Sequence, residues 1–275
     1  MGSSRSRLEG EELHGNSPTL LPRDHLSEVN KQLDQIAEHF RDARRIVALT
    51  GAGASAESGI PTFRDALTGL WARFRPEELA TPEAFAAHPD RVTQWYESRR
   101  QGVLACQPNQ GHSVLAAMEE WAESSGRHFS MVTQNVDGLH QRAGSRNVLE
   151  LHGSLLRWRG CESGNTVQLP KKAQTEFPIR SVSGEMLRPD VVWFGEALPE
   201  TVFSAALQAT AQADVFLTIG TSSVVYPAAG LIDIALEAGA VTIEINPEET
   251  PFSGRVDHAL ALSSGRCLQG IFDRL

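Results

Sequence analysis

Residues 46–56 read IVALTGAGASA, a β-favouring run that ends directly in a glycine-rich turn. A short, nearly uninterrupted apolar run of this kind is typical of a strand buried on both faces of a parallel sheet. The turn satisfies the G-x-G-x-x-G/A pattern, in which small residues let backbone amides approach a pyrophosphate. The stretch therefore predicts a nucleotide-binding strand and loop, although the same pattern also fits a tight strand-to-helix turn without a ligand.

Outward from this stretch, strand-like and helix-like segments alternate. Similar apolar runs recur at residues 131–133, 148–151, 215–219 and 241–245. Helical spacing of apolar residues marks residues 26–40, 113–124, 200–212 and 227–237, the last with Pro227 at a plausible first helical position. The alternation predicts an α/β fold built on a doubly wound, parallel, Rossmann-like sheet.

Two segments interrupt the alternation. Residues 65–110 read as a mostly helical excursion, and residues 157–188 are polar and poor in strand or helix pattern. We expect both to build a smaller second domain, with the large domain covering about 24–64, 111–153 and 189–275 and a cleft between the two. Residues 1–23 are polar and lack hydrophobic periodicity, which predicts a disordered tail or a vector scar.

Composition narrows the classes of function. The formal net charge of −9 argues against a body that binds nucleic acid by general electrostatics. No apolar run approaches the ~20 residues of a membrane-spanning helix, and charges stand where a secretion signal has its apolar stretch. The three cysteines have no disulfide or metal spacing, which favours a reducing cytoplasm. From the charge and the missing apolar run we expect neither nucleic-acid nor membrane partners.

Polar residues follow four of the expected strands. They are the stretch QNVDGLH at 134–140, His152, the stretch GTSS at 220–223, and Asn246. Because parallel sheets bind ligands at the carboxyl ends of their strands, four such positions favour a dinucleotide. A neutral imidazole at His152 could act as a general base near pH 7. The plainer readings are Asx-type turns for the asparagine and aspartate, and a structural histidine.

Six motifs stand in one order along the chain. They are GAGASAESGIPTFRD, TQNVDGLHQRAG, LHGSL, RPDVVWFGE, GTSSVVYPA and INPEE. From about Arg45 to the C-terminus the chain thereby resembles the sirtuin family. The resemblance implies an NAD-dependent enzyme that removes acyl groups from lysine side chains and yields nicotinamide, deacylated lysine and O-acyl-ADP-ribose.

The resemblance also implies the binding residues. His152 matches the general base that draws a proton from the nicotinamide ribose, and Asn135 and Asp137 match positions of the nicotinamide pocket, so these three are the expected catalytic residues. The expected cofactor-binding residues are Gly51, Ala52, Gly53, Ser55, Phe63, Arg64, Gln134, Val136, Gly220, Thr221, Ser222, Asn246 and Cys267. For Cys267, which lies in a region near adenine in the family, a small buried side chain is the plainer reading.

Substrate binding is implied by two further stretches. Residues Val192, Trp193 and Phe194 resemble the strand that lines the acyl channel, continuing into Gly195 and Glu196, and this strand should pair with the substrate backbone. Such pairing gives affinity with little selectivity for peptide sequence. The expected partners are therefore acyl-lysine proteins or peptides.

Tyr96 and Arg99 resemble the pair found in sirtuins that remove succinyl, malonyl and glutaryl groups. Their spacing places them on one face of a helix, and a guanidinium fork suits a carboxylate. The small Ala80 agrees with a roomy acyl pocket. The competing reading is an amphipathic surface helix with a solvated arginine.

The zinc module of the family is where this chain departs from the pattern. The family usually carries two pairs of cysteines between the LHGS and RP-x-V motifs, whereas residues 154–188 contain only Cys161. Four thiolates hold a closed structural zinc, so we expect no zinc or other metal here. Apolar contacts through Trp158 and Phe177 are one possible replacement.

Three other classes of function compete with the deacylase. The same pocket could hydrolyse NAD or transfer ADP-ribose to a protein. A non-catalytic sensor of NAD or ADP-ribose is disfavoured by Asn135, Asp137 and His152, since a sensor needs no base. A dehydrogenase is more distant, because the acidic residue usual about 20 positions after the glycine loop is missing.

Overall fold

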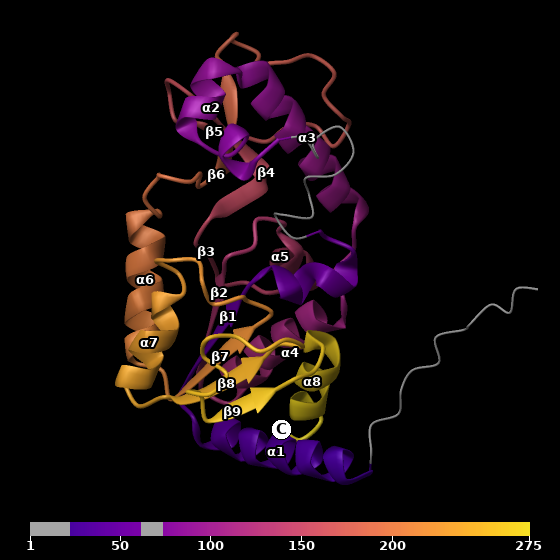
Figure 1. Ribbon diagram of the computed structural model, residues 1–275, viewed down its shortest axis with the longest axis vertical. Helices are drawn as coiled ribbons and strands as arrows, with labels where there is room; N and C mark the ends of the chain where they lie inside the picture. Colours follow the sequence, from indigo (N-terminus) through magenta and orange to yellow (C-terminus); the bar gives the residue numbers. More distant parts are fainter. Residues whose placement is uncertain (1–22, 62–73) are drawn as a thin grey trace, which may run out of the picture.

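The computed structural model describes residues 23–61 and 74–275 (Figure 1). Phe63 and Arg64, both expected to bind the cofactor, lie outside these residues. The described chain forms a six-stranded parallel sheet flanked by helices and, at one end of it, a small antiparallel sheet with its own helices.

The large sheet has the strand order β3-β2-β1-β7-β8-β9, and every pairing in it is parallel. Its strands are β1 (Arg45–Thr50), β2 (His128–Thr133), β3 (Val148–Glu150), β7 (Val215–Ile219), β8 (Val241–Ile245) and β9 (His258–Leu260). The order reverses between β1 and β7, and open α/β sheets bind ligands beyond the carboxyl ends of strands at such a point. The prediction of a doubly wound parallel sheet is confirmed.

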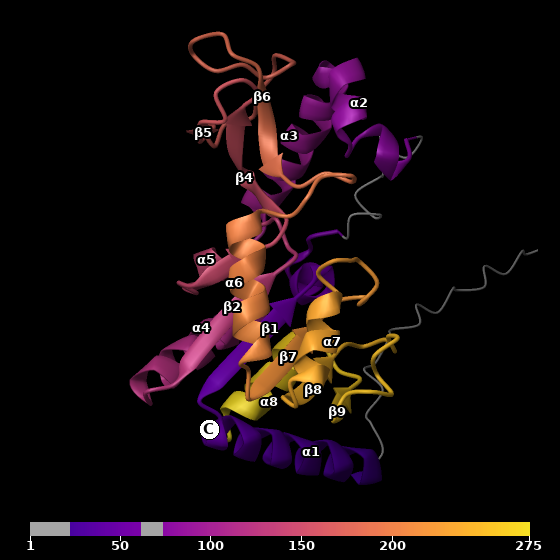
Figure 2. The ribbon, with the colours of Figure 1, turned by 90° about the vertical axis from the view of Figure 1, so that its left-hand side faces the viewer.

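Helices cover both faces of this sheet, as Figures 1 and 2 show. One face carries α1 (Arg23–Asp42), α4 (Gln110–Ser124) and α8 (Ser264–Phe272), and the other carries α6 (Glu200–Ala211) and α7 (Gly230–Glu237). Alternate residues of β1 explain the arrangement, because Ile46 packs in the first cluster and Val47 in the second. A strand buried on both sides has to be apolar throughout.

Two expected helix starts differ from the structure. The first helix begins at Arg23, ahead of the expected start at Leu26. Helix α7 begins at Gly230, so Pro227 does not occupy its first position. The Pro227 carbonyl instead accepts a hydrogen bond from the Gly230 amide at 3.0 Å, which closes a turn before the helix.

The small domain combines both interruptions of the α/β alternation. Its described elements are η3 (Pro76–Glu78), α2 (Pro82–Ala87), α3 (Pro89–Ala105), β4 (Gly153–Gly160), β5 (Thr166–Val167) and β6 (Leu187–Val191). Residues 157–188 were expected to lack regular structure, and this was wrong, since they hold the end of β4, all of β5 and the start of β6. The pattern was hidden because arginines alternate with the buried Trp158 along β4.

A third apolar cluster fills the small domain, separate from the two clusters of the large sheet. It includes Leu79, Phe85, Trp95, Trp158, Leu187 and Trp193, with Phe177 packed against it. The two parts meet where β3 leads into β4 through Gly153, whose φ is +77°. A side chain at Gly153 would place Cβ 2.1 Å from the Asp190 carbonyl oxygen, so only glycine permits this crossing.

Among the described residues, no helix combines the length and the apolar character needed to cross a membrane.

Candidate functional site

The loops after β1 and β7 are locked together by their glycines. The Gly51 amide donates to the Ile219 carbonyl at 2.9 Å, and the Gly53 amide donates to the Gly220 carbonyl at 2.7 Å. A Cβ on Gly220, whose φ is +58°, would lie 2.3 Å from the Ala54 nitrogen. The glycine-rich turn therefore serves loop packing at the switch point, and leads into a 3₁₀ helix, η1 (Ala52–Ser58).

A buried polar cluster joins the β1 loop to the β2 loop. Ser55 Oγ donates to Asp137 Oδ2 at 2.7 Å, while Asn135 Nδ2 donates to Ser55 Oγ at 3.1 Å and to the Gly51 carbonyl at 3.0 Å. Asp137 Oδ1 accepts from the Leu139 amide at 2.9 Å, at the start of α5 (Leu139–Ala143). Because these side chains satisfy one another, the structure brings together three of the predicted residues in a preorganised arrangement.

Two histidines that sequence reasoning missed line the same cluster. His112 Nε2 lies 3.3 Å from Ser55 Oγ, and the His140 ring packs 4.8 Å from the His112 ring. His140 Nε2 is 2.9 Å from Thr50 Oγ1 at the end of β1. Burial lowers the pKa of His112, and burial together with neighbouring His112 lowers the pKa of His140 to about 3. Both rings are therefore neutral at pH 7.

The signal that could have found His112 is local. Asn109 and His112 form a capping box at the start of α4, in which the Asn109 side chain accepts from the His112 amide. Asn109 Nδ2 also donates to the Ala54 carbonyl at 2.9 Å, so the helix start and the glycine loop are tied together. Asparagine is a favoured N-cap residue, so Asn109 indicates a helix start, but it does not predict the contact with a loop 55 residues away in the sequence.

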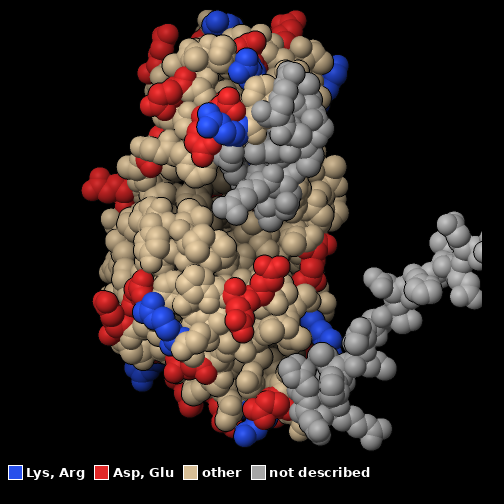
Figure 3. All heavy atoms as spheres, in the orientation of Figure 1, with Lys and Arg blue, Asp and Glu red and all other residues tan. Residues whose placement is uncertain are grey.

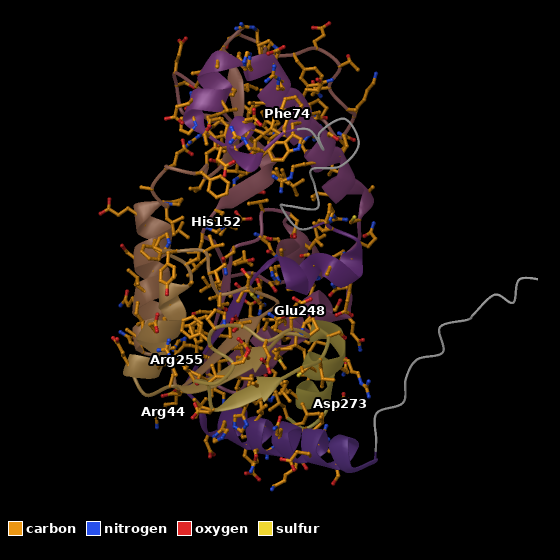
Figure 4. The ribbon with its side chains drawn as sticks, in the orientation of Figure 1. Arg44, Phe74, His152, Glu248, Arg255 and Asp273 are labelled. Carbon is orange, nitrogen blue, oxygen red and sulfur yellow. The ribbon has the colours of Figure 1, made fainter. Side chains whose placement is uncertain are left out.

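His152 stands where the chain leaves the large sheet for the small domain (Figure 4). Its Nδ1 lies 3.0 Å from the Gln134 carbonyl oxygen. A carbonyl only accepts, so Nδ1 carries the hydrogen and, in the neutral ring, Nε2 is left as the acceptor. Burial lowers the pKa of His152, with the Gln134 carbonyl opposing that shift in part. The ring is thereby a neutral base with a fixed tautomer.

Thr221 links the polar groups at the other strand ends. Gln134 Nε2 donates to Thr221 Oγ1 at 3.0 Å, and Asn246 Nδ2 donates to the Thr221 carbonyl at 3.0 Å. Ser222 is exposed beside it. Ser223 is buried with φ +58°, a strained value for a residue other than glycine, and its Oγ has no hydrogen-bond partner among the described residues. The predicted residues Gln134, Thr221 and Asn246 are thus brought together at the ends of β2, β7 and β8.

Cys267 and Val136 sit differently from the other expected cofactor residues. The Cys267 side chain is fully buried in the core, and burial raises the pKa of its thiol to about 12. Any contact with a nucleotide would come from the neighbouring backbone, where Glu57 accepts from the Gly265 amide at 3.1 Å. The Val136 carbonyl accepts from the Leu155 amide at 2.8 Å, which ties the β2 loop to β4.

Tyr96 and Arg99 lie together on α3, as their spacing predicts. The Arg99 guanidinium stands 5.6 Å from the centre of the Tyr96 ring and 4.9 Å from that of Trp95. Tyr96 is only 2% exposed, and burial raises the pKa of its phenol to about 12, so it remains a neutral donor. Burial also lowers the pKa of Arg99, although its side chain keeps part of its surface open.

The expected strand at Val192–Phe194 is wrong, because β6 ends at Val191 and the chain turns. The Val192 amide donates to the His152 carbonyl at 2.9 Å, and the Phe194 amide donates to the Ala80 carbonyl at 3.0 Å. Gly195, with φ +86°, allows the reversal. Trp193 is buried with its ring 6.3 Å from that of Tyr96, while Phe194 is half exposed.

The Glu196 carboxylate holds this turn together by hydrogen bonds. Its two carboxylate oxygens accept from Arg188 at 2.7 and 2.9 Å, and Oε2 also accepts from the Trp193 amide at 2.8 Å. The Arg188 guanidinium stacks 3.4 Å from the centre of the Trp193 ring. The Glu196 carboxylate therefore holds Trp193 beside Tyr96, while the substrate pairing expected of this segment would involve its backbone.

The surface is hollowed at the level where the two parts of the molecule meet (Figure 3).

Within residues 23–61 and 74–275, no three His, Cys, Asp or Glu side chains are grouped as a metal site would require. Cys161 is exposed near the end of β4.

Comparisons with known proteins agree with each other. A protein-family model described as the Sir2 family matches residues 51–227. The NAD-dependent protein deacylase of Deinococcus radiodurans is 50% identical over 241 residues, which cover 86% of this chain and 97% of that protein. A crystal structure of a Sir2 homologue in complex with NAD superposes with a TM-score of 0.80 at 44% identity, covering 87% of this chain and 92% of the other.

A more distant solved structure is also similar. It is a Sir2 variant with a deacetylated p53 peptide and 3′-O-acetyl ADP-ribose, at a TM-score of 0.76 and 28% identity, and the match covers 88% of this chain and 97% of the other.

Proposed function

This chain belongs to the Sir2 family, and on that premise we propose that it is an NAD-dependent protein-lysine deacylase that prefers succinyl, malonyl or glutaryl groups. The observation that carries the proposal is His152, a neutral imidazole at the junction of the large sheet and the small domain, whose Nε2 has no hydrogen-bond partner among the described residues. The relatives named as NAD-dependent protein deacylases support the reaction class.

The strand ends fit a dinucleotide in their chemistry. Amide and hydroxyl groups of Gln134, Thr221 and Asn246 suit ribose and phosphate oxygens, and the buried Ser223 hydroxyl lacks a partner among the described residues. The Gly51 and Gly220 loops converge where dinucleotides bind in such sheets. NAD would supply the ribose that receives the acyl group and the nicotinamide that leaves.

His152 would take the proton from the attacking ribose hydroxyl. Its Nδ1–H is held by the Gln134 carbonyl, so the ring cannot turn to present the wrong nitrogen. Since its pKa lies below the ordinary value, the ring is unprotonated at neutral pH and ready to accept.

Ser55, Asn135 and Asp137 would orient the carboxamide end of the cofactor. Their mutual hydrogen bonds fix each side chain before ligand binds, which reduces the reorganisation needed in the reaction. His112 supports Ser55 from behind at 3.3 Å.

The acyl preference rests on α3. Tyr96 can donate from a phenol that stays neutral, and Arg99 offers a cation shielded by the Trp95 and Tyr96 rings. A carboxylate in such a partly dry place interacts more strongly with a guanidinium than it would in water. The small Ala80, whose carbonyl accepts from the Phe194 amide, belongs to the same apolar cluster as Tyr96 and would leave room for a longer acyl group.

The reaction class is tested by identifying every product. A succinyl-lysine peptide is incubated with enzyme and NAD, and nicotinamide, free-lysine peptide and O-succinyl-ADP-ribose are quantified by mass spectrometry. Equal amounts of all three support acyl transfer to ADP-ribose. Nicotinamide without deacylated peptide would replace the proposal with NAD hydrolysis, and ADP-ribose attached to protein would replace it with ADP-ribosyl transfer.

A further inference from the structure

Helix α3 carries a buried ion pair directly beside the two acyl-site candidates. Glu97 and Arg100 each follow one position after Tyr96 and Arg99. Arg100 Nε donates to Glu97 Oε2 at 2.7 Å, and Nη2 donates to Oε1 at 2.9 Å. The Arg100 and Glu97 side chains are only 3% and 4% exposed. Two charges removed from water this completely need further hydrogen bonds to offset the loss of hydration.

Those further bonds lead to one loop, residues 170–174. Arg100 Nη2 donates to the Pro170 carbonyl at 3.0 Å, and Glu97 Oε1 accepts from the Gln174 amide at 3.0 Å. A neighbouring residue of α3, Gln101, reinforces the link. Its Nε2 reaches Glu97 Oε1 at 2.9 Å and the Lys171 carbonyl at 3.1 Å.

The loop has little else to order its backbone. It belongs to the connection between β5, which ends at Val167, and β6, which begins at Leu187. That stretch contains no helix or strand, and the Arg180–Met186 bridge is its only ladder contact among the described residues. Long connections without regular structure need anchoring contacts, and here a carboxylate and a guanidinium on one helix provide them.

We propose that Glu97 and Arg100 are a positioning pair that fastens the 170–174 loop to α3 and thereby holds Tyr96 and Arg99 at the angle needed for a charged acyl group. The second half of the proposal rests on the proposed function, and the first half does not. Because Tyr96 and Glu97 are adjacent, as are Arg99 and Arg100, any tilt of this turn of α3 moves the acyl-site side chains with the pair.

The anchoring is tested by limited proteolysis of the full chain with endoproteinase Lys-C. The sequence has only three lysines, Lys31 in α1 and Lys171 and Lys172 in the anchored loop. Two variants release the loop differently. Glu97→Gln leaves Arg100 without its charged partner, and Glu97→Met with Arg100→Met removes both charges while keeping the space filled.

In both variants, cleavage at Lys171 and Lys172 should accelerate at least about tenfold while cleavage at Lys31 keeps its rate, because only the loop opens. Glu123→Gln is the matched control, since it breaks the exposed pair with Arg146 and should leave all three sites unchanged. Unchanged loop cleavage, or equal acceleration at Lys31, would overturn the anchoring.

The positioning is tested by kinetics of the Glu97→Met, Arg100→Met double variant. The KM for a succinyl-lysine peptide should rise about tenfold, the loss expected when a charged contact is misaligned, while the KM for NAD and the kcat on an acetyl-lysine peptide stay near wild type. Equal changes in all three would contradict positioning. A wild-type enzyme without succinyl preference would contradict the proposed function, while the Lys-C result would still decide the anchoring.

Discussion

At the scale of single residues, the candidate site is built from side chains that hold one another in place by hydrogen bonds. The Gln134 carbonyl fixes the tautomer of His152, and Asp137 accepts a hydrogen bond from the Ser55 hydroxyl. Burial keeps His112 and His140 neutral. The hydrogen-bond donors and acceptors of the candidate site are therefore held in place by neighbouring protein groups.

His152→Ala tests the role of the base. A positioned base contributes about 100- to 10,000-fold to a rate, so kcat should fall by that range while the Kd for NAD stays within about threefold. Steady-state kinetics and calorimetric titration with NAD measure the two. His128→Ala, at the exposed start of β2, serves as the control and should leave both unchanged; turnover near wild type in His152→Ala would remove the residue from the mechanism.

His140 should make the folded state sensitive to acid. Its pKa is about 3 in the fold against 6.5 ordinarily, so between these values the unfolded chain binds the extra proton. Stability is therefore complete above pH 6.5 and falls as the pH decreases toward 3, by up to about 1.4 kcal/mol per pH unit from this group.

Urea denaturation of His140→Gln at several pH values measures this contribution. Below neutral pH, the free energy of unfolding of the variant should depend less steeply on pH than that of wild type, by about one bound proton. The same slope in His140→Gln as in wild type would show that the ring is not kept neutral by burial.

At the scale of elements, the strand-end loops were visible in the sequence and much of the small domain was not. Apolar runs followed by Gly51, Gln134, His152 and Gly220 indicated both strands and site, because parallel strands end at one edge. The strands β4 and β6 escaped notice because Arg157, Arg159 and Arg188 alternate with buried residues in a domain that is covered on one side only.

Contacts between segments far apart in the chain could not be predicted from local sequence patterns either. The approach of His112 to Ser55 joins a helix start to a loop 57 residues away, and no local pattern encodes it. The same holds for the Glu196 carboxylate, whose ion pair with Arg188 no sequence pattern indicated. Phe63 and Arg64 lie outside the described residues, and their proposed roles remain predictions.

Gly220→Ala tests the packing of the two loops. Both Gly220 and Gly126 have positive φ, +58° and +72°, but a Cβ meets the Ala54 nitrogen at 2.3 Å only at Gly220, and nothing lies within 4 Å at Gly126. Alanine at Gly126 should cost about 1 kcal/mol for its conformation, and at Gly220 at least about twice that. Chemical denaturation measures the free energy of unfolding of both variants. Equal losses of this free energy at the two sites would mean that the loops are not closely packed.

At the scale of the whole molecule, two bodies share one site at their junction. The chain crosses between them at His152 and Gly153, and Arg157 of β4 bridges Glu150 of β3 and Asp190 of β6 at 2.5 and 3.1 Å. His152, the proposed base, therefore lies where the large sheet, the small sheet and the turn after β6 converge. Such placement lets both parts of the molecule contribute to one reaction.

The small domain should hold its shape without metal. A single cysteine in residues 154–188 cannot supply a four-thiolate site, whereas Trp158 and Leu187 are fully buried in an apolar cluster of their own. Incubation with a zinc chelator should leave the Tm and turnover unchanged, and native mass spectrometry should show the mass of the bare chain. A fall in Tm with chelator, restored by zinc, would refute this expectation.

The preference for an acidic acyl group is tested most directly by comparing one peptide bearing acetyl-, succinyl- or glutaryl-lysine, with wild type and Arg99→Met side by side. We predict that wild type has its highest kcat/KM on an acidic acyl group. In Arg99→Met, kcat/KM on that substrate should fall at least about tenfold, because a hydrogen bond to a charged group is worth about 1.5 to 3 kcal/mol. The fall on acetyl-lysine should be much smaller. A wild-type preference for acetyl-lysine, or equal losses on all three substrates, would contradict the account.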